Sequence, residues 1–183
     1  MQQAVFKDCF FASFKVQTVV QLESIMRHSV TKLETEFAHD HRSLTRGFAQ
    51  IMEALRQDDW TKAVQLATDL NQHGGPHISF EERVLYPIVR MSLGEEYVRN
   101  LYDEHDIAID ALRDLISHPS LADANEERKQ YLLKMLQTGL DHAVSCGSLL
   151  SHLTVLDETT QEHLLDELHK SRIEGKSMLE LKP

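Results

Sequence analysis

Histidine and carboxylate side chains are the residues of this chain that could carry out chemistry, and two of them have the spacing of metal ligands. His77 and Glu81 are four residues apart, which in a helix places an imidazole and a carboxylate on one face about a turn apart. Such a pair chelates an iron-class or zinc-class ion. The chain also has 11 histidines but a single tryptophan, and histidine is the commonest metal ligand. The composition and this pair therefore indicate metal binding.

Three further histidines recur with apolar residues at helical intervals. His41 follows Phe37 by four residues and precedes Leu44 by three, and His105 has the same relation to Leu101 and Ala108. His142 follows Gly139 by three residues and precedes Cys146 by four. Steps of three and four keep side chains on one stripe of a helix. We therefore expect one inward histidine on each of four helices. A buried imidazole without a partner costs about 1–3 kcal/mol, so a shared metal ion is favoured over four separate core histidines.

Long amphipathic helices must position these side chains. Helix-period patterns cover about residues 31–58, 59–93, 101–115 and 123–157, and a shorter helix is predicted to begin at a capping-box pattern after Thr159. Asp59 is the expected cap of the second helix. The sequence Gly74-Gly75-Pro76 interrupts that helix, and we predict a kink or a local π-bulge there because proline removes a helical hydrogen bond.

The fold class that follows is all-α, an up-down-up-down antiparallel four-helix bundle over residues 29–157. Residues 1–28 form an N-terminal extension, and residues 158–183 form a C-terminal helix and tail. The first 27 residues and residues 159–174 have apolar faces beyond what a four-helix core needs. We expect these segments to cover the bundle or to form a homodimer.

Charge and cysteine content exclude several partners. Lys and Arg number 19 and Asp and Glu 29, a net charge of −10, which repels phosphate backbones, so we expect no nucleic-acid partner. The sequence contains no uninterrupted stretch of about 18 apolar residues, so we predict no membrane span. Cys9 and Cys146 stand far apart in the sequence and do not suggest a disulfide framework. These features favour a cytoplasmic protein.

The sequence HISFEERVLYP spans residues 77–87, with Asp40-His41-Arg42-x-Leu44 before it and Glu104-His105 after it. This segment resembles the H-x3-E-E-x-x-L-(F/Y)-P signature of hemerythrin-like (HHE cation-binding) domains, and the flanking motifs are similar to those of the family's first and third helices. The resemblance covers about residues 31–157. It implies a four-helix bundle that holds one or two non-haem iron ions, or another divalent transition metal, with dioxygen or nitric oxide as the small ligand.

The sequence departs from the family pattern on the fourth helix. The family usually has a second carboxylate four or five residues after the histidine of that helix, where this chain has Cys146 and Gly147. A thiolate at Cys146 would be an effective soft ligand beside a metal ion, but we favour a packing role, since buried cysteines are commonly small apolar residues. The predicted metal ligands are His41, His77, Glu81, His105 and His142, with His73 as a candidate sixth ligand and Asp110 as a candidate bridge. This set leaves one or two metal ions open.

Other function classes fit the sequence less fully. No catalytic triad, P-loop or dinucleotide fingerprint is visible, so we expect a binding module rather than an enzyme. One alternative is a helical adaptor or sensor domain without metal, favoured by the departure at Cys146. Another is an HD-type metal phosphohydrolase that uses the doublets His39-Asp40 and His105-Asp106, although the negative charge steers phosphates away.

Overall fold

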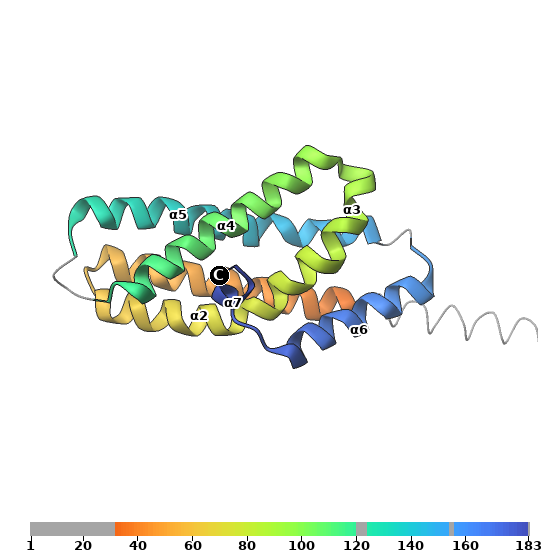
Figure 1. The fold of residues 1–183 in the computed structure, drawn as a ribbon, viewed down its shortest axis with the longest axis horizontal. Helices are drawn as coiled ribbons and strands as arrows, with labels where there is room; N and C mark the ends of the chain where they lie inside the picture. Colours follow the sequence, from red (N-terminus) through yellow and green to blue (C-terminus); the bar gives the residue numbers. More distant parts are fainter. Residues whose placement is uncertain (1–31, 120–123, 154–155, 183) are drawn as a thin grey trace, which may run out of the picture.

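The computed structural model describes residues 32–119, 124–153 and 156–182, and these residues form helices and short connections without any strand (Figure 1). The predicted all-α class is confirmed over this part of the chain. The predictions for residues 1–28 lie outside the described residues. The elements are a first helix over residues 32–56, α2 (Trp60–Phe80), the π-helical segment η1 (Glu81–Leu85), α3 (Tyr86–Leu93), α4 (Glu95–Ser117), α5 (Glu126–Ser145), the 3-10 helical segment η3 (Cys146–Leu153), α6 (Glu158–Glu174) and α7 (Met178–Leu181).

Acidic side chains begin two of these helices. Asp59 accepts a hydrogen bond from the backbone N–H of Lys62 at 3.0 Å and caps α2, as predicted. Asp157 accepts from the backbone N–H of Thr160 at 3.0 Å, so α6 begins directly after Asp157 rather than after Thr159. A carboxylate at this position satisfies an N–H that has no partner within the helix.

The irregular turn of the second helix is not where the sequence pattern placed it. The prediction of a π-bulge at Gly74-Gly75-Pro76 is wrong in position, because Pro76 lies inside α2 and the π-helical segment η1 begins five residues later. The two glycines instead let another segment approach closely. A Cβ atom on Gly75 would lie 2.0 Å from the carbonyl oxygen of Lys176. The glycines are thus required by packing against the C-terminal segment.

The fourth predicted helix also changes character. Its α-helical part ends at Ser145, and η3 continues as a 3-10 helix. Gly147 weakens an α-helix at this point. In addition, the hydroxyl groups of Ser145, Ser148 and Ser151 each donate to the carbonyl oxygen three residues earlier, at 3.2, 2.9 and 2.7 Å. Such side-chain bonds compete with α-helical ones.

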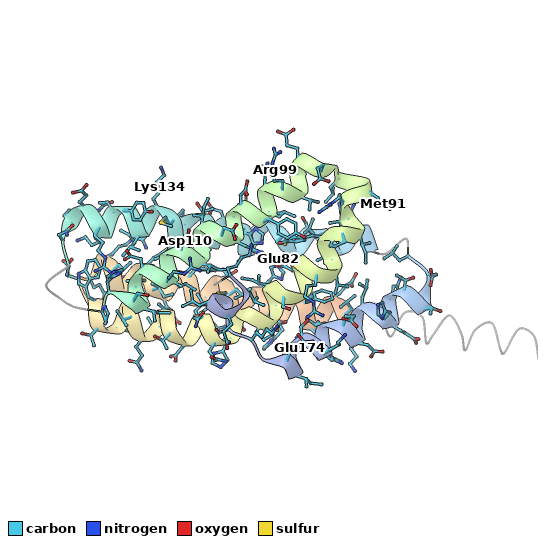
Figure 2. The ribbon with its side chains drawn as sticks, in the orientation of Figure 1. Glu82, Met91, Arg99, Asp110, Lys134 and Glu174 are labelled. Carbon is cyan, nitrogen blue, oxygen red and sulfur yellow. The ribbon has the colours of Figure 1, made fainter. Side chains whose placement is uncertain are left out.

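Two clusters of buried apolar side chains fill the interior. The Phe48 cluster includes Phe48, Ile51, Leu112 and Leu136. The Phe37 cluster includes Phe37, Phe80, Leu85 and Leu101. Helices α2 and α4, and α4 and α5, pack against each other around these clusters. Helices α2 and α5 lie along the long axis of the molecule, and α4 crosses it obliquely (Figure 1). Charged side chains such as Arg99, Lys134 and Glu174 point outward (Figure 2).

The C-terminal segment shares both clusters. Helix α6 packs on α2 and η1 and buries Leu164 and Leu168 completely in the Phe37 cluster. Met178 of α7 is 1 % exposed and belongs to the Phe48 cluster. Residues 159–174 were predicted either to cover the bundle or to form a homodimer. In the structure, they pack against the other helices and cover the bundle. Among the described residues, no helix is long and apolar enough to cross a membrane.

Candidate metal centre

The four inward histidines form a polar layer between the two apolar clusters. On the first helix, His41 stands between Phe37 of one cluster and Leu44 of the other. The other three histidines, His77 on α2, His105 on α4 and His142 on α5, are buried at the same level, and all four line one cavity. The periodicity of the sequence therefore brings the imidazoles together as predicted.

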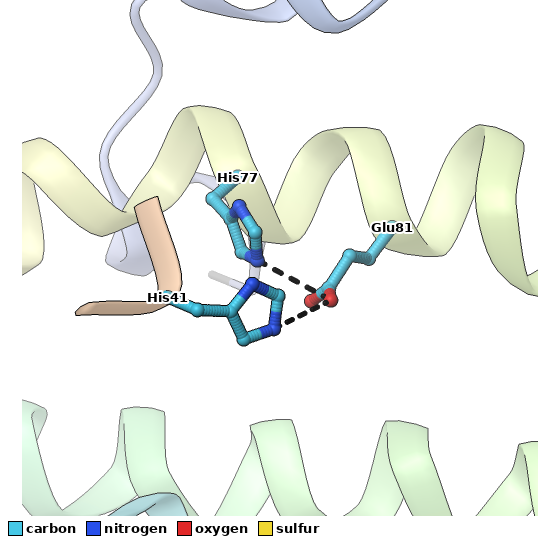
Figure 3. A group of neighbouring side chains, drawn as sticks. All are labelled: His41, His77 and Glu81. Atoms are coloured by element: carbon cyan, nitrogen blue, oxygen red, sulfur yellow. Dashed lines mark ion pairs between the residues drawn. The ribbon is translucent and has the colours of Figure 1, made fainter. Parts of the chain in front are cut away.

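The carboxylate of Glu81 lies at the centre of this layer and is 1 % exposed. Its Oε1 lies 3.6 Å from Nε2 of His41 and 3.3 Å from Nε2 of His77 (Figure 3). Its Oε2 lies 3.2 Å from Nε2 of His105 and 4.0 Å from Nε2 of His142. We call His41, His77 and Oε1 subsite A, and His105, His142 and Oε2 subsite B. One carboxylate thus joins two sets of two imidazoles.

The π-helical segment places a second side chain beside Glu81. At 100° per residue, residues five apart in an α-helix point about 140° away from each other. In η1, however, the backbone N–H of Tyr86 donates to the carbonyl oxygen of Glu81, five residues earlier. This π turn brings both side chains to one face. The hydroxyl group of Tyr86 consequently donates to Glu81 Oε2 at 3.4 Å, and Tyr86 is fully buried.

Each of the four histidines directs its outer nitrogen, Nδ1, at an oxygen acceptor. The pairs are His41 with the carbonyl of Phe37 at 3.0 Å, His77 with Asp40 at 3.5 Å, His105 with Glu82 at 2.9 Å and His142 with Glu104 at 2.7 Å. Carbonyl and carboxylate oxygens only accept, so Nδ1 carries the proton. In a neutral imidazole the Nε2 lone pair then faces Glu81, which is the tautomer that binds a metal ion.

Asp40, Glu82 and Glu104 accept hydrogen bonds from three of the histidines. The sequence analysis did not predict which histidine each of these carboxylates contacts. Asp40 precedes His41 yet contacts His77, and Glu104 precedes His105 yet contacts the histidine of α5. A residue next to an inward ligand points about 100° around the helix, that is, toward a neighbouring helix. The acidic residues that adjoin His41, Glu81 and His105 were the signal that could have revealed these contacts.

The charges of the layer shift the protonation of its groups. Burial, together with the neighbouring His77, lowers the pKa of His41 to about 4. Burial also lowers the pKa of His77, but the charges of Glu81 and Asp40 outweigh it and raise that pKa to about 9. The pKa of His142 is likewise raised to about 9, because Glu104 and Glu81 outweigh burial.

Glu81 remains ionised at the centre of these imidazoles. Burial alone would raise its pKa, but the charge of His77 and the hydrogen bonds of His105 and His142 hold the pKa well below the ordinary value. At neutral pH the layer therefore contains an anionic carboxylate and two protonated imidazoles, those of His77 and His142. A divalent cation would replace the positive charge of those protons.

Two buried nitrogen atoms supply a direct test of whether a metal ion fits. Within the described residues, Nε2 of His41 and Nε2 of His77 have no hydrogen-bond partner. Buried polar atoms almost always have one. The four histidines and Glu81 line a cavity of about 20 Å³, which has room for one water-sized particle. An ion bound in subsite A would satisfy both nitrogens, so the residues present fit a metal ion.

Tyr86 and Cys146 complete the cluster. The Tyr86 hydroxyl lies 3.2 Å from Nε2 of His105 and 3.3 Å from Nε2 of His142, so it occupies the middle of subsite B. Cys146 is 1 % exposed, and its Sγ donates to Glu81 Oε1 at 2.9 Å. Burial and the charge of Glu81 raise the pKa of both groups. Cys146 is therefore buried, as a packing residue would be, but it also contacts the carboxylate of Glu81.

Two candidate ligands lie outside the cluster. His73 is exposed, and its Nδ1 donates to the carbonyl oxygen of Asp69 in its own helix at 2.7 Å. It stands one turn before His77 but is not among the residues that line the cavity. Asp110 is exposed and pairs with Arg113. Five of the six predicted metal ligands are thus brought together.

The fold separates one of the two doublets of the phosphohydrolase alternative. Asp106 is exposed and pairs with Lys182 at 2.5 Å, while the adjoining His105 points into the bundle. In the other doublet, Nδ1 of the exposed His39 lies 3.7 Å from Oδ1 of Asp40, whose Oδ2 is held by Arg172 at 2.8 Å. The doublet His39-Asp40 therefore stays together, outside the layer of inward histidines.

The family model of the hemerythrin HHE cation binding domain matches residues 33–145, which is more than half of the chain. The match contains all four inward histidines and Glu81 and ends one residue before Cys146. No curated protein and no solved structure matches the chain.

Proposed function

Because this chain belongs to the hemerythrin HHE cation-binding family, we propose that it is a non-haem iron domain. Its four long helical segments would form an up-down-up-down bundle around one or two iron ions, with another divalent transition metal as the alternative occupant. The bound metal would serve to bind or sense dioxygen, nitric oxide or a related oxidant, or the domain would handle iron itself.

The donor set supports iron. Subsite A offers His41, His77 and one oxygen of Glu81, and two imidazoles with one carboxylate are the ligands that non-haem Fe(II) proteins use, with positions left open for a small ligand. Subsite B offers the same donor types through the other oxygen of Glu81. Iron bound there would supply reversible binding of a diatomic molecule and one-electron chemistry.

The surrounding side chains have separate tasks. Asp40, Glu82 and Glu104 hold the imidazole rings and make them better donors. Phe37 packs on the rings of His41 and His77, with ring centroids 4.3 and 4.8 Å away. These apolar contacts keep bulk water from the ligands.

The observation that carries the proposal is the convergence of four buried Nε2 atoms on one buried carboxylate, two of them without a partner among the described residues. The test is the iron content of the full chain after anaerobic reconstitution with ferrous iron. Wild type is expected to retain iron through desalting, whereas the double variant His77→Ala, His105→Ala loses it. His73→Ala is the matched control, because it removes an exposed histidine of the same helix. Full retention by the double variant would refute the proposal.

A metal-free adaptor domain has one observation in its favour. The Tyr86 hydroxyl lies 3.2 and 3.3 Å from the inner nitrogens of His105 and His142, so a protein group stands beside these nitrogens where a metal ion would otherwise be needed. Subsite A has no such substitute, since the inner nitrogens of His41 and His77 lack partners among the described residues. We therefore expect subsite A to fill first, and a chain that binds no metal at all would favour the adaptor.

A further inference from the structure

We propose that Cys146 is a metal ligand whose thiolate stands where family members have a second carboxylate, so that the centre of this chain contains a sulfur donor. This inference rests on the proposed function, because a ligand requires a metal ion. It goes further in naming the donor that distinguishes this chain and the ions that the donor selects.

The position of the sulfur atom is the first argument. Cys146 follows His142 by four residues, and its Sγ reaches Oε1 of Glu81 at 2.9 Å. Donor atoms of Glu81, His142 and Cys146 all lie within 4.8 Å of one another. A single ion can contact donors at such separations, since metal–nitrogen and metal–sulfur bonds are about 2.0–2.3 Å long.

The unpartnered nitrogens are an independent argument. The oxygen that accepts the Cys146 hydrogen bond is the same Oε1 that faces His41 and His77. Both of those imidazoles are more than nine-tenths buried, and their Nε2 atoms have no hydrogen-bond partner among the described residues. The thiol therefore points to the place where buried donors without a partner converge. The sulfur atom also lies within 4.8 Å of a ring nitrogen of His142, which belongs to subsite B. Sγ is therefore within reach of both subsites.

The charge of the centre favours this role. Glu81 is the only carboxylate among the predicted ligands that the structure brings together, and it supplies one negative charge to a buried divalent ion. On metal binding, the thiol of Cys146 releases its proton to solvent and its sulfur lone pair forms the metal–sulfur bond, which adds the second negative charge. A neutral buried centre avoids the cost of an uncompensated charge.

A sulfur donor alters which ions the site prefers. Thiolates bind soft and borderline ions such as Zn²⁺, Co²⁺ and Fe²⁺ and discriminate against ions that prefer oxygen, such as Mg²⁺ and Mn²⁺. We therefore expect the centre to bind cobalt or zinc at least as readily as iron, and to bind manganese weakly.

Cobalt provides the test, because a Co²⁺–thiolate bond gives an intense near-ultraviolet charge-transfer band that imidazole and carboxylate ligands do not give. The chain has two cysteines, so Cys9→Ser leaves Cys146 as the sole thiol of the full chain. That variant, loaded with Co²⁺, is expected to keep the band and the cobalt content of wild type. Cys146→Ser is expected to lose the band, to keep cobalt on its histidines, and to bind it at least about 10-fold more weakly.

The outcomes separate the two proposals. Cobalt bound to the Cys9→Ser variant without a charge-transfer band overturns the role of Cys146 and leaves the metal centre standing. A band that persists in Cys146→Ser does the same. No cobalt, iron or zinc bound to wild type overturns both. If Cys146→Ser fails to fold, the band of the Cys9→Ser variant decides the question by itself.

Discussion

Substitution of Gly75 by alanine should detach the C-terminal segment from the metal-binding helices. An added Cβ would lie 2.0 Å from the carbonyl oxygen of Lys176 and 2.6 Å from the carbonyl carbon of Ser177. These are backbone atoms, which cannot rotate away as a side chain can. We therefore expect residues 176–178 to be displaced from α2.

The magnitude follows from what is lost. Burial of Met178, which is 1 % exposed, contributes about 1.5–3 kcal/mol. The hydrogen bond from the backbone N–H of Leu179 to Asn71 at 2.9 Å contributes about 0.5–1.5 kcal/mol. Alanine in a helix regains about 1 kcal/mol relative to glycine. The net loss in the free energy of unfolding is roughly 1–3 kcal/mol, and Tm falls by about 2–4 °C for each kcal/mol in a chain of this length.

Thermal unfolding followed by circular dichroism measures this effect in the metal-free protein. Gly147→Ala is the matched control, since its Cβ would meet no atom within 4 Å, and it should leave Tm unchanged or raise it, because alanine favours a helix by up to about 1 kcal/mol relative to glycine. Gly74→Ala should lie between the two, because its closest contact is the flexible end of Met178 at 2.0 Å. If Gly75→Ala melts with the control, the close approach of residues 176–178 to α2 is not formed in solution and the reasoning fails.

Two further predictions concern the metal ligands. Glu104→Gln removes the charged acceptor that holds Nδ1 of His142 at 2.7 Å, so metal affinity in a chelator competition should fall by about 10–100-fold. The deficit should be clearest at a pH above the pKa of His142, which is raised to about 9, because protons no longer compete there, and an unchanged affinity in that range would contradict the assigned role. Metal affinity should also rise with pH from about 6 to 9, because His77 and His142 have a pKa raised to about 9 and must lose protons before they bind a metal ion. A titration that gives the same affinity across this range would exclude these two histidines as ligands.

The sequence by itself determined the features that depend on helical periodicity, because this periodicity involves only residues close together in the chain. Spacings of three and four residues were enough to predict an all-α chain and the inward direction of His41, His77 and His105, because side-chain direction in a helix is set by residue number alone. The cap at Asp59 was also predictable, since its hydrogen bond is made three residues along the same chain.

The tertiary structure decided what depends on contacts between distant segments. The partner of each outer imidazole nitrogen, such as Asp40 for His77, lies on another helix 37 residues away, and no periodicity encodes it. The π turn at Glu81 brings the Tyr86 hydroxyl into the layer of histidines. The glycines that precede it instead allow residues 176–178 to approach α2 closely. The place of Cys146 beside Glu81 likewise joins residues 65 apart. Such contacts depend on how the helices pack, and packing is a property of the whole fold.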